Sequence, residues 1–162
     1  MVKNDLNRKT VLDLSKLKIN INLKFTIMAN NSRGVLKFNG GEDQKIIKLN
    51  YQVSRTTDVS GRVASDPSNA LIKLTIEATE SSTILESLLN GKYKPTVGDI
   101  TFNKAHEEGV LINLKWENGY VIQHELDFDS LNDNNMLITF VVSAEKIDYG
   151  AAAYDGVWPS AR

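Results

Sequence analysis

The chain has 162 residues, with 19 lysines and arginines against 20 aspartates and glutamates, a formal net charge of −1, and no cysteine. This length suits a single domain with a continuous hydrophobic core. The lack of cysteine excludes disulfides, thiolate metal sites and cysteine nucleophiles, and the near-zero charge argues against nucleic acid or an anionic membrane surface as a partner.

Segments that would direct the chain to or through a membrane are also missing from the sequence. No apolar run approaches the roughly 20 residues that a membrane-spanning helix needs. Charged and amide side chains interrupt residues 12–27, so this region lacks the apolar core of a signal peptide. We therefore expect a soluble chain that is made in the cytoplasm and, where it is exported, leaves without a signal peptide.

Residues 1–27 differ from the rest of the chain and allow two interpretations. Apolar side chains alternate there with polar ones, which suits an additional edge strand: Leu17, Ile19, Ile21, Leu23, Phe25 and Ile27. The stretch that begins at Met28 looks like a natural start, so residues 1–27 can equally be an upstream extension. Both interpretations stay open, and we place the working domain at residues 28–162.

The first clear hairpin lies at residues 35–54. Period-two alternation predicts strands at 35–39 and 45–54, and Asn39-Gly40-Gly41 between them is a turn signal. The alternation places Ile47, Leu49, Tyr51 and Val53 on one face of the second strand, with polar residues on the other.

The stretch from Arg55 to Asn69 is a connection between two predicted strands, and hairpin loops usually have only about 2 to 5 residues. Its charged residues add up to a net charge of zero: Arg55, Asp58, Arg62 and Asp66. Small apolar residues lie among them. This composition argues against simple disorder. We therefore expect a functional loop against which another surface packs.

One strand and one helix follow the loop. Alternation in 70–78 predicts a strand with one buried face. Helical spacing then indicates one short amphipathic helix with Ile84, Leu85, Leu88 and Leu89 on its apolar stripe. Thr83 and Glu86 fit a capping box, and Gly91 lies where the helix should end.

The remaining strands are predicted at 99–104, 110–117, 120–129 and 136–146, with a hairpin turn at Asn118-Gly119. The last strand is apolar on both faces in its middle, so we expect it to be central or covered on two sides. The whole is mainly β: an antiparallel β-barrel of about seven strands with one short flanking α-helix and a long protruding loop. Closing the sheet into a barrel, or packing it as a sandwich, would remove most exposed sheet edges, and we prefer the barrel.

Three carboxylates on one strand face are the first candidates for chemistry. Glu125, Asp127 and Asp129 alternate along the predicted strand 120–129. General acid and base catalysis needs carboxylates that converge across a pocket in different environments. Three in a row more often form a solvated face, which could line a polar channel or meet the lysines of a neighbouring subunit.

The two histidines give no stronger signal. His124 shares the parity of Ile122 and Leu126, so we expect it on the apolar side as a partly buried side chain. His106 is followed by two glutamates, but adjacent residues in a turn rarely point at one ion. No glycine-rich phosphate loop and no nucleophile elbow is found. We predict no catalytic, cofactor-binding or metal site.

The carboxy-terminal tail carries aromatic side chains, of which Tyr154 and Trp158 are candidates for an interface. They can dock on the same subunit or on a neighbouring one, and both alternatives stay open.

Four stretches from Met28 onward resemble the tube-forming protein of bacterial type VI secretion systems, the Hcp (TssD) family, in the form found in Bacteroidetes. Their order and spacing carry the resemblance: 49–62 (LNYQVSRTTDVSGR), 85–90 (LESLLN), 98–102 (GDITF) and 139–145 (TFVVSAE).

The resemblance implies a non-enzymatic β-barrel that forms hexameric rings, which stack into a tube. The tube lies inside a contractile sheath, carries a spike, and is propelled into a target cell with effectors. The loop from Arg55 to Asn69 corresponds to the family's contact between rings, and its interface residues would be Arg55, Thr57, Asp58, Val59, Gly61, Arg62 and Val63. Glu125 and Asp127 are candidates for a polar face toward the lumen.

Three alternatives to this function remain. One is a tube subunit of a related extracellular or phage-like contractile injection system. Another is a barrel that binds a small ligand in its interior, although bulky residues such as Trp116 and Phe140 suggest a filled core. A third is a hydrolase that uses Glu125 and Asp127.

Overall fold

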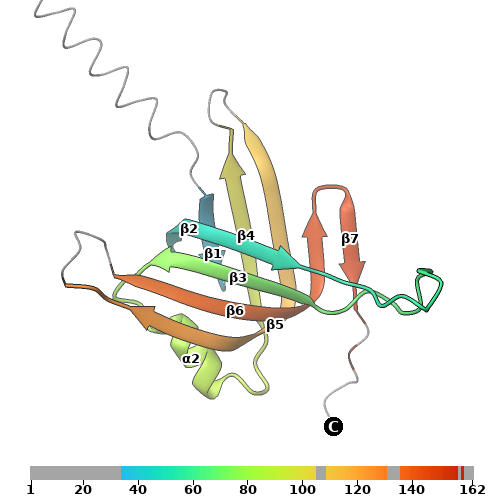
Figure 1. Ribbon diagram of the computed structural model, residues 1–162. Coiled ribbons are helices and arrows are strands. Elements are labelled where there is room, and N and C mark those ends of the chain that lie inside the picture. Colours follow the sequence, from blue (N-terminus) through green and yellow to red (C-terminus); the bar gives the residue numbers. More distant parts are fainter. Residues whose placement is uncertain (1–33, 105–108, 131–135, 157, 159–162) are drawn as a thin grey trace, which may run out of the picture.

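The computed structural model describes residues 34–104, 109–130, 136–156 and 158 (Figure 1). Within these ranges the chain forms seven strands and one helix: β1 (Gly34–Phe38), β2 (Asp43–Gln52), β3 (Ala70–Glu77), α2 (Thr83–Asn90), β4 (Thr96–Asn103), β5 (Val110–Asp127), β6 (Leu137–Tyr149) and β7 (Ala152–Asp155). The predicted strand or extension at residues 1–27 lies outside the described part. No described helix has the length and apolar character to cross a membrane.

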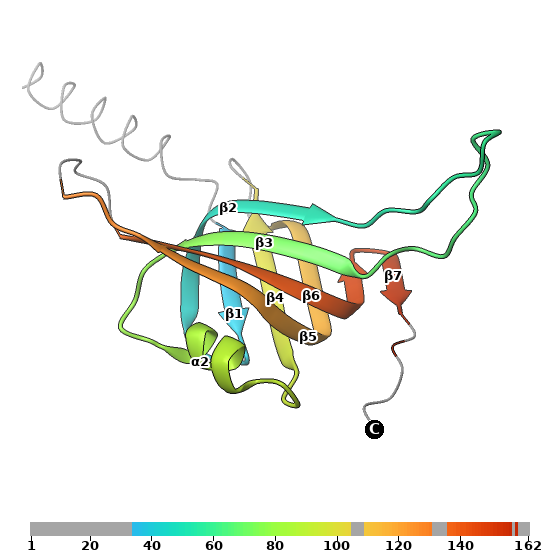
Figure 2. The same ribbon diagram turned by 60° about the horizontal axis from the view of Figure 1, so that its bottom comes forward.

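The strands close into an antiparallel barrel, as predicted. Hydrogen-bonded neighbours follow the order β3-β2-β1-β4-β5-β6-β7, and an additional pairing of β3 with β6 closes the ring. β7 pairs with the end of β6 and lies outside that ring. In Figures 1 and 2, β2, β3, β6 and the second half of β5 form one layer, and β1, β4 and the first half of β5 form the layer that crosses it.

The turn between β1 and β2 lies where the sequence predicts it. Asn39 has φ 51° and Gly40 has φ 70°, the left-handed conformations that tight hairpin turns require and that Asn-Gly sequences adopt easily. The Asn39 side chain also accepts a hydrogen bond from Val97 N–H at 2.9 Å, so the turn is fixed to β4.

A bulge interrupts the predicted apolar face of β2. Ile46 lies opposite Ile76, but the register then shifts to Lys48, so Ile47 is the extra residue of a β-bulge. Ile46 before the bulge is buried and Leu49 after it is partly buried, whereas Ile47 is 47% exposed. The bulge moves the apolar face by one residue, which regular alternation cannot reveal. Two other predicted members of the face are exposed as well: Tyr51 and Val53.

Asn118-Gly119 does not form a hairpin. β5 runs through this dipeptide as one strand, so the predicted pair of strands at 110–117 and 120–129 is wrong. Asn118 has φ 49° and lies where the pairing with β4 shifts register. Because a residue with positive φ serves a bulge as well as a turn, the dipeptide here bends a continuous strand. The first half of β5 then pairs with β4, and its second half extends along β6.

Trp116 occupies the centre of the barrel and is 1% exposed. Its ring lies 6.2 Å from that of Phe38, and two glycines give it space. A Cβ atom added at Gly98 would lie 2.0 Å from the Trp116 ring, and one added at Gly119 would lie 2.6 Å from it. Both positions therefore require glycine for packing.

The core is made mainly by the inner faces of β3 and β6. The predicted alternation of β3 is confirmed, because Ala70, Ile72, Leu74 and Ile76 are all fully buried. β6 is central as predicted, since it pairs with β3, β5 and β7. The other buried core residues come from all layers: Leu36, Phe38, Ile46, Ile84, Ile100, Leu114, Trp116, Val121, Ile138, Phe140, Val142, Ala144 and Ile147.

The predicted helix is present as α2, but its start and its apolar stripe differ in detail. Ser82 is the N-cap residue, and its hydroxyl bonds the Glu86 carboxylate instead of a backbone N–H, so the predicted capping box is wrong. Ile84 is buried and Leu88 packs on the core. The other half of the stripe faces away from the barrel: Leu85 and Leu89 are 38% and 70% exposed.

Candidate functional site

The connection between β2 and β3 is a ribbon of two paired arms that projects from the barrel (Figure 2). At its base, Ser68 N–H donates to Ser54 O at 2.7 Å, and Ser54 N–H donates to Ser68 Oγ at 3.0 Å. Further out, Thr57 opposes Val63 in an isolated β-bridge. Because the arms bond to each other, the ribbon keeps its shape although nearly all its side chains are exposed.

Asp58 shapes the tip of this ribbon. Its Oδ1 accepts hydrogen bonds from Ser60 N–H at 2.8 Å and from Arg62 N–H at 2.9 Å, the arrangement by which aspartate stabilises turns. Gly61 has φ 78°, which favours glycine. The tip turns tightly, and the Val59 side chain is fully exposed at its end.

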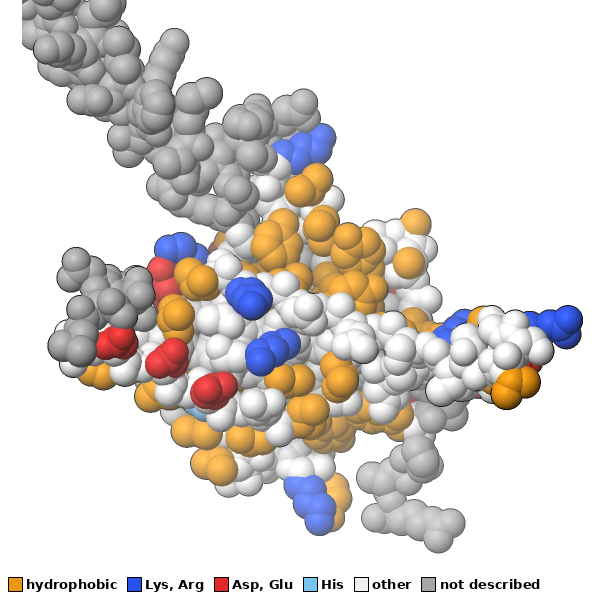
Figure 3. All heavy atoms as spheres, viewed as in Figure 1, with side chains coloured by type: hydrophobic (Ala, Val, Ile, Leu, Met, Phe, Trp, Pro, Cys, Tyr) orange, Lys and Arg blue, Asp and Glu red, His pale blue; other side chains and the backbone are white. Residues whose placement is uncertain are grey.

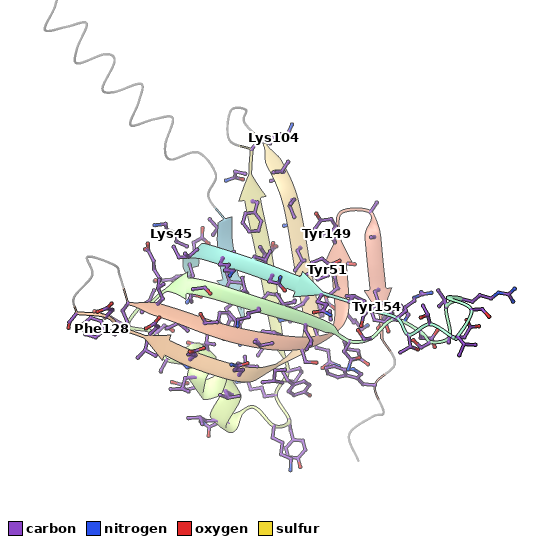
Figure 4. All side chains as sticks on the ribbon, in the orientation of Figure 1. Lys45, Tyr51, Lys104, Phe128, Tyr149 and Tyr154 are labelled. Carbon is purple, nitrogen blue, oxygen red and sulfur yellow. The ribbon has the colours of Figure 1, made fainter. Side chains whose placement is uncertain are left out.

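The base of the ribbon is tied to the carboxy-terminal tail. Tyr154 Oη donates to Pro67 O at 2.8 Å, and Trp158 Nε1 donates to Asn69 Oδ1 at 2.6 Å. Figure 4 shows Tyr154 where the ribbon leaves the barrel. Of the two alternatives for the tail, docking on the same subunit is present. A contact of Tyr154 and Trp158 with a neighbouring subunit stays a prediction.

Glu145 and Tyr120 hold the tail in place. Trp158 N–H donates to Glu145 Oε1 at 2.7 Å, Gly156 N–H donates to Glu145 O at 2.9 Å, and Asn118 donates to the other carboxylate oxygen. The Trp158 ring lies 5.7 Å from that of Tyr120. The strand bend at Asn118 and the anchor of the ribbon are therefore parts of one connected network.

The outer face of the layer β2-β3-β6-β5 is mainly polar (Figure 3). One row across it joins Lys48, Thr75, Thr139 and Glu125 through successive strand pairings, and the two threonine hydroxyls are 2.9 Å apart. Asp127 lies one row further along β5. The structure thus places Glu125 and Asp127 together on an exposed face, with no convergence on a pocket.

The opposite layer carries a second polar network, around Asp99 on β4. Asn113 Nδ2 donates to Asp99 Oδ1 at 2.7 Å, and Lys115 Nζ lies 3.1 Å from Asp99 Oδ2. Partial burial works to raise the pKa of Asp99, but the hydrogen bonds from Asn113 and Lys115 and the charge of Lys115 together lower it below its usual range.

The histidine predictions are only partly covered by the described residues. His124 lies opposite Phe140 on the inner side of β5 and is partly buried, as its parity predicted. His106, Glu107 and Glu108 lie outside the described residues. Elsewhere, no group of three or more histidine, aspartate or glutamate side chains is arranged to hold a metal ion in the part of the chain that is described.

A sequence model for one family matches almost the whole chain. The family is described as "Hemolysin coregulated protein Hcp (TssD)", and the match covers residues 14–159. This chain belongs to the Hcp (TssD) family. No curated protein matches this Hcp chain by sequence.

Solved Hcp structures share the fold of this Hcp chain. Hcp1 from Flavobacterium johnsoniae has 26% sequence identity and a TM-score of 0.68, over 76% of this chain and 99% of its own length. A mutant Hcp1 from E. coli EAEC 042 has 20% identity and a TM-score of 0.61, over 79% and 99%. The tube terminator structure of an extracellular contractile injection system, PVC, has 13% identity and a TM-score of 0.51, over 74% and 94%.

Family membership and fold together establish the general role of this Hcp chain. It is a structural tube subunit of a type VI secretion system. The resemblance noted in the sequence is therefore confirmed. The Hcp family is a family of structural tube proteins.

Several residues that organise the Hcp ribbon were not singled out from the sequence. Ser54, Ser68 and Asn69 bond the base of the ribbon, and Glu145 holds the tail. Serine and asparagine in loops often bond nearby backbone groups, so their presence at both ends of the loop was a usable signal. Glu145 gave no such sequence signal, because its hydrogen-bond partners are distant in the sequence.

Proposed function

We propose that six copies of this chain form a ring, and that the ribbon of each copy reaches the adjacent ring so that rings stack into a tube. The observation that carries this proposal is the ribbon itself. It projects far from the barrel, is internally bonded, and is anchored at its base by Tyr154 and Trp158. A segment held in this way is prepared for binding before a partner arrives, which lowers the entropy lost on contact.

The ring-to-ring contact is proposed for the outer half of the ribbon. Val59 and Val63 offer apolar surface there, since they are 107% and 61% exposed. Asp58 and Gly61 keep the tip in shape. In the described part of the chain, the side chains of Arg55 and Arg62 form no ion pair. Thr57 completes the proposed interface set.

A stable interface buries about 800 Å² per partner, which is more than a narrow ribbon supplies. Barrel surfaces therefore contribute as well. The polar outer face that carries Glu125 and Asp127 is proposed to line the lumen, because a tube that releases its cargo needs a wall without adhesive apolar area. The partners are the sheath, the spike and secreted effectors, and assembly takes place in the cytoplasm before export without a signal peptide.

Residues 28–162 are proposed to suffice for assembly. The family match begins at residue 14 and so includes part of the segment that this boundary sets aside. A chain that starts at Met28 and forms the same rings as the full chain supports the boundary. Loss of the rings in the shorter chain contradicts it.

Replacing residues 59–63 with a short Gly/Ser linker tests the stacking role. The barrel does not depend on these exposed residues, so we expect single rings without stacked tubes in negative-stain electron microscopy. A control is Val97→Ser, which removes an exposed valine of the barrel and should leave tubes intact. Tubes formed by the linker variant, or a linker variant that does not fold, would contradict the proposal.

The ligand-binding alternative finds no support in the barrel interior. Trp116, Phe38 and Phe140 meet there, with the Phe38 and Phe140 rings 6.1 Å apart. Side chains thus fill the space that a carrier protein would leave for its ligand.

A further inference from the structure

Two exposed apolar surfaces lie on opposite margins of the polar outer face. Hydrophobic side chains gather above β2 and again along the lower margin near β5 and α2, with polar side chains between them (Figure 3). The sheet order β2-β3-β6-β5 places β2 and β5 at the two sides of that face. Single exposed apolar residues are common on soluble proteins, but gathered ones mark contact sites.

The first surface, the β2-side patch, comprises the exposed Tyr51, Val110 and Tyr149 together with the half-buried Ile112. The Tyr51 and Tyr149 rings stack with centroids 6.0 Å apart and remain 41% and 38% exposed, and they lie side by side in Figure 4. Ile112 and Val110 lie two residues apart on β5, and Val110 is 53% exposed. The ends of β4 and β5 beside this patch rise beyond β2 in Figure 1.

The second surface, the β5-side patch, comprises Ile122, Leu126, Phe128, Leu85 and Leu89. The first three belong to the second half of β5 and the residue that follows it, and they are 52%, 56% and 63% exposed. The two leucines form the outward half of the α2 stripe, and α2 packs beside β5. This surface explains why half of the predicted helix stripe is not buried.

We propose that the β2-side patch of one copy packs on the β5-side patch of a second copy, and that this head-to-tail contact repeats around the ring. The inference rests on the proposed ring. Contacts between two different surfaces of identical subunits can close into rings. Because the patches flank the same polar face, joining them would keep that face continuous from subunit to subunit.

The charges along the two margins favour this pairing over like-with-like contacts. Lys48 lies on β2, whereas Glu125 and Asp127 lie on β5 of the same outer face. A head-to-tail contact brings the basic margin of one copy to the acidic margin of the next. Pairing two β2 margins would oppose lysines, and pairing two β5 margins would oppose carboxylates, so both are disfavoured.

Two single variants and their mixture test the proposal. Tyr149→Lys disables the β2-side patch and Leu126→Lys disables the β5-side patch, and each is expected to be a monomer of 18.0 kDa by sedimentation and native mass spectrometry. In an equimolar mixture, the intact β5-side patch of the first variant meets the intact β2-side patch of the second. The mixture should therefore give dimers of twice the monomer mass, and no rings.

The controls make each outcome decisive. Val97→Lys places the same charge on an exposed valine outside both patches and should keep the rings. Rings formed by either patch variant, a dimer formed by one variant alone, or a mixture that stays monomeric would overturn the proposed pairing. Wild-type protein without rings would instead refute the proposed function on which it rests. A variant without a cooperative thermal transition is not folded. In that case Val110→Lys replaces Tyr149→Lys and Phe128→Lys replaces Leu126→Lys, because these positions are more exposed.

Discussion

The Trp158 indole N–H donates to Asn69 Oδ1 at 2.6 Å, so the last described residue of the chain holds the base of the long ribbon. The two residues are 89 positions apart in the sequence. Together with the hydrogen bond from Tyr154 to Pro67, this contact fixes the direction in which the ribbon leaves the barrel.

Trp158→Phe should loosen the ribbon without unfolding the barrel. The variant loses the hydrogen bond to Asn69 but keeps a ring against Tyr120. An exposed hydrogen bond is worth about 0.5–1.5 kcal/mol, so we expect backbone amides near Ser68 to exchange with solvent several-fold faster, measured by hydrogen exchange and mass spectrometry. Tyr93→Phe, at an exposed tyrosine, is the control. Equal exchange in Trp158→Phe and wild type would show that the anchor has no effect.

Gly61→Ala should impair stacking and leave the barrel stable. Gly61 has φ 78°, a conformation that costs a residue with a Cβ about 1–2 kcal/mol. The tip therefore relaxes to another shape while the core is untouched. We expect an unchanged midpoint of thermal unfolding together with fewer stacked rings in electron micrographs. Ser60→Ala, beside it, keeps the backbone geometry and should stack normally. Normal tubes from Gly61→Ala would argue against a defined tip conformation at the contact.

Gly98→Ala should destabilise the barrel strongly for so small a change. The new Cβ would lie 2.0 Å from the Trp116 ring, which is enclosed by the core. Overpacking of this kind lowers the free energy of unfolding by about 1–3 kcal/mol. The free energy of unfolding is measured by urea denaturation at one fixed protein concentration. The neighbouring Val97→Ala, at an exposed site, should change stability by less than about 0.5 kcal/mol, and an equally small effect of Gly98→Ala would contradict the packing described.

Asp99→Asn should reduce the dependence of stability on acid pH. The folded-state pKa of Asp99 is lowered, so the unfolded chain binds this proton more readily than the folded chain. The stabilisation by the carboxylate is complete above the unfolded pKa, near 4, and is lost as the pH falls through the folded value. We expect the wild type to be the more stable protein at neutral pH and the difference to shrink below about pH 4. A difference that is constant with pH would rule out this linkage.

Much of the barrel could be predicted because its signal is local. The alternation in β3 reflects burial of one face, and in β6 every second residue from Ile138 to Ala144 is likewise buried in the core. β7 was not predicted, since Ala152–Asp155 has no alternating pattern and is a strand only because β6 lies beside it. Among the described residues there are seven strands, the number predicted, but they are not the predicted seven: β7 is additional, and two predicted strands are merged in β5.

The sequence alone determined a mainly β chain with one helix and one unusually long connection. It could do so because residue alternation, turn residues and the composition of the loop are local properties. The tertiary structure decided where bulges shift the buried face at Ile47, whether Asn118-Gly119 turns or bends a strand, and what holds the ribbon. These outcomes depend on the competition between partners far apart in the chain, such as Trp158 with Asn69 and Gly98 with Trp116. Such pairings carry no periodic signal and exist only once the barrel has closed.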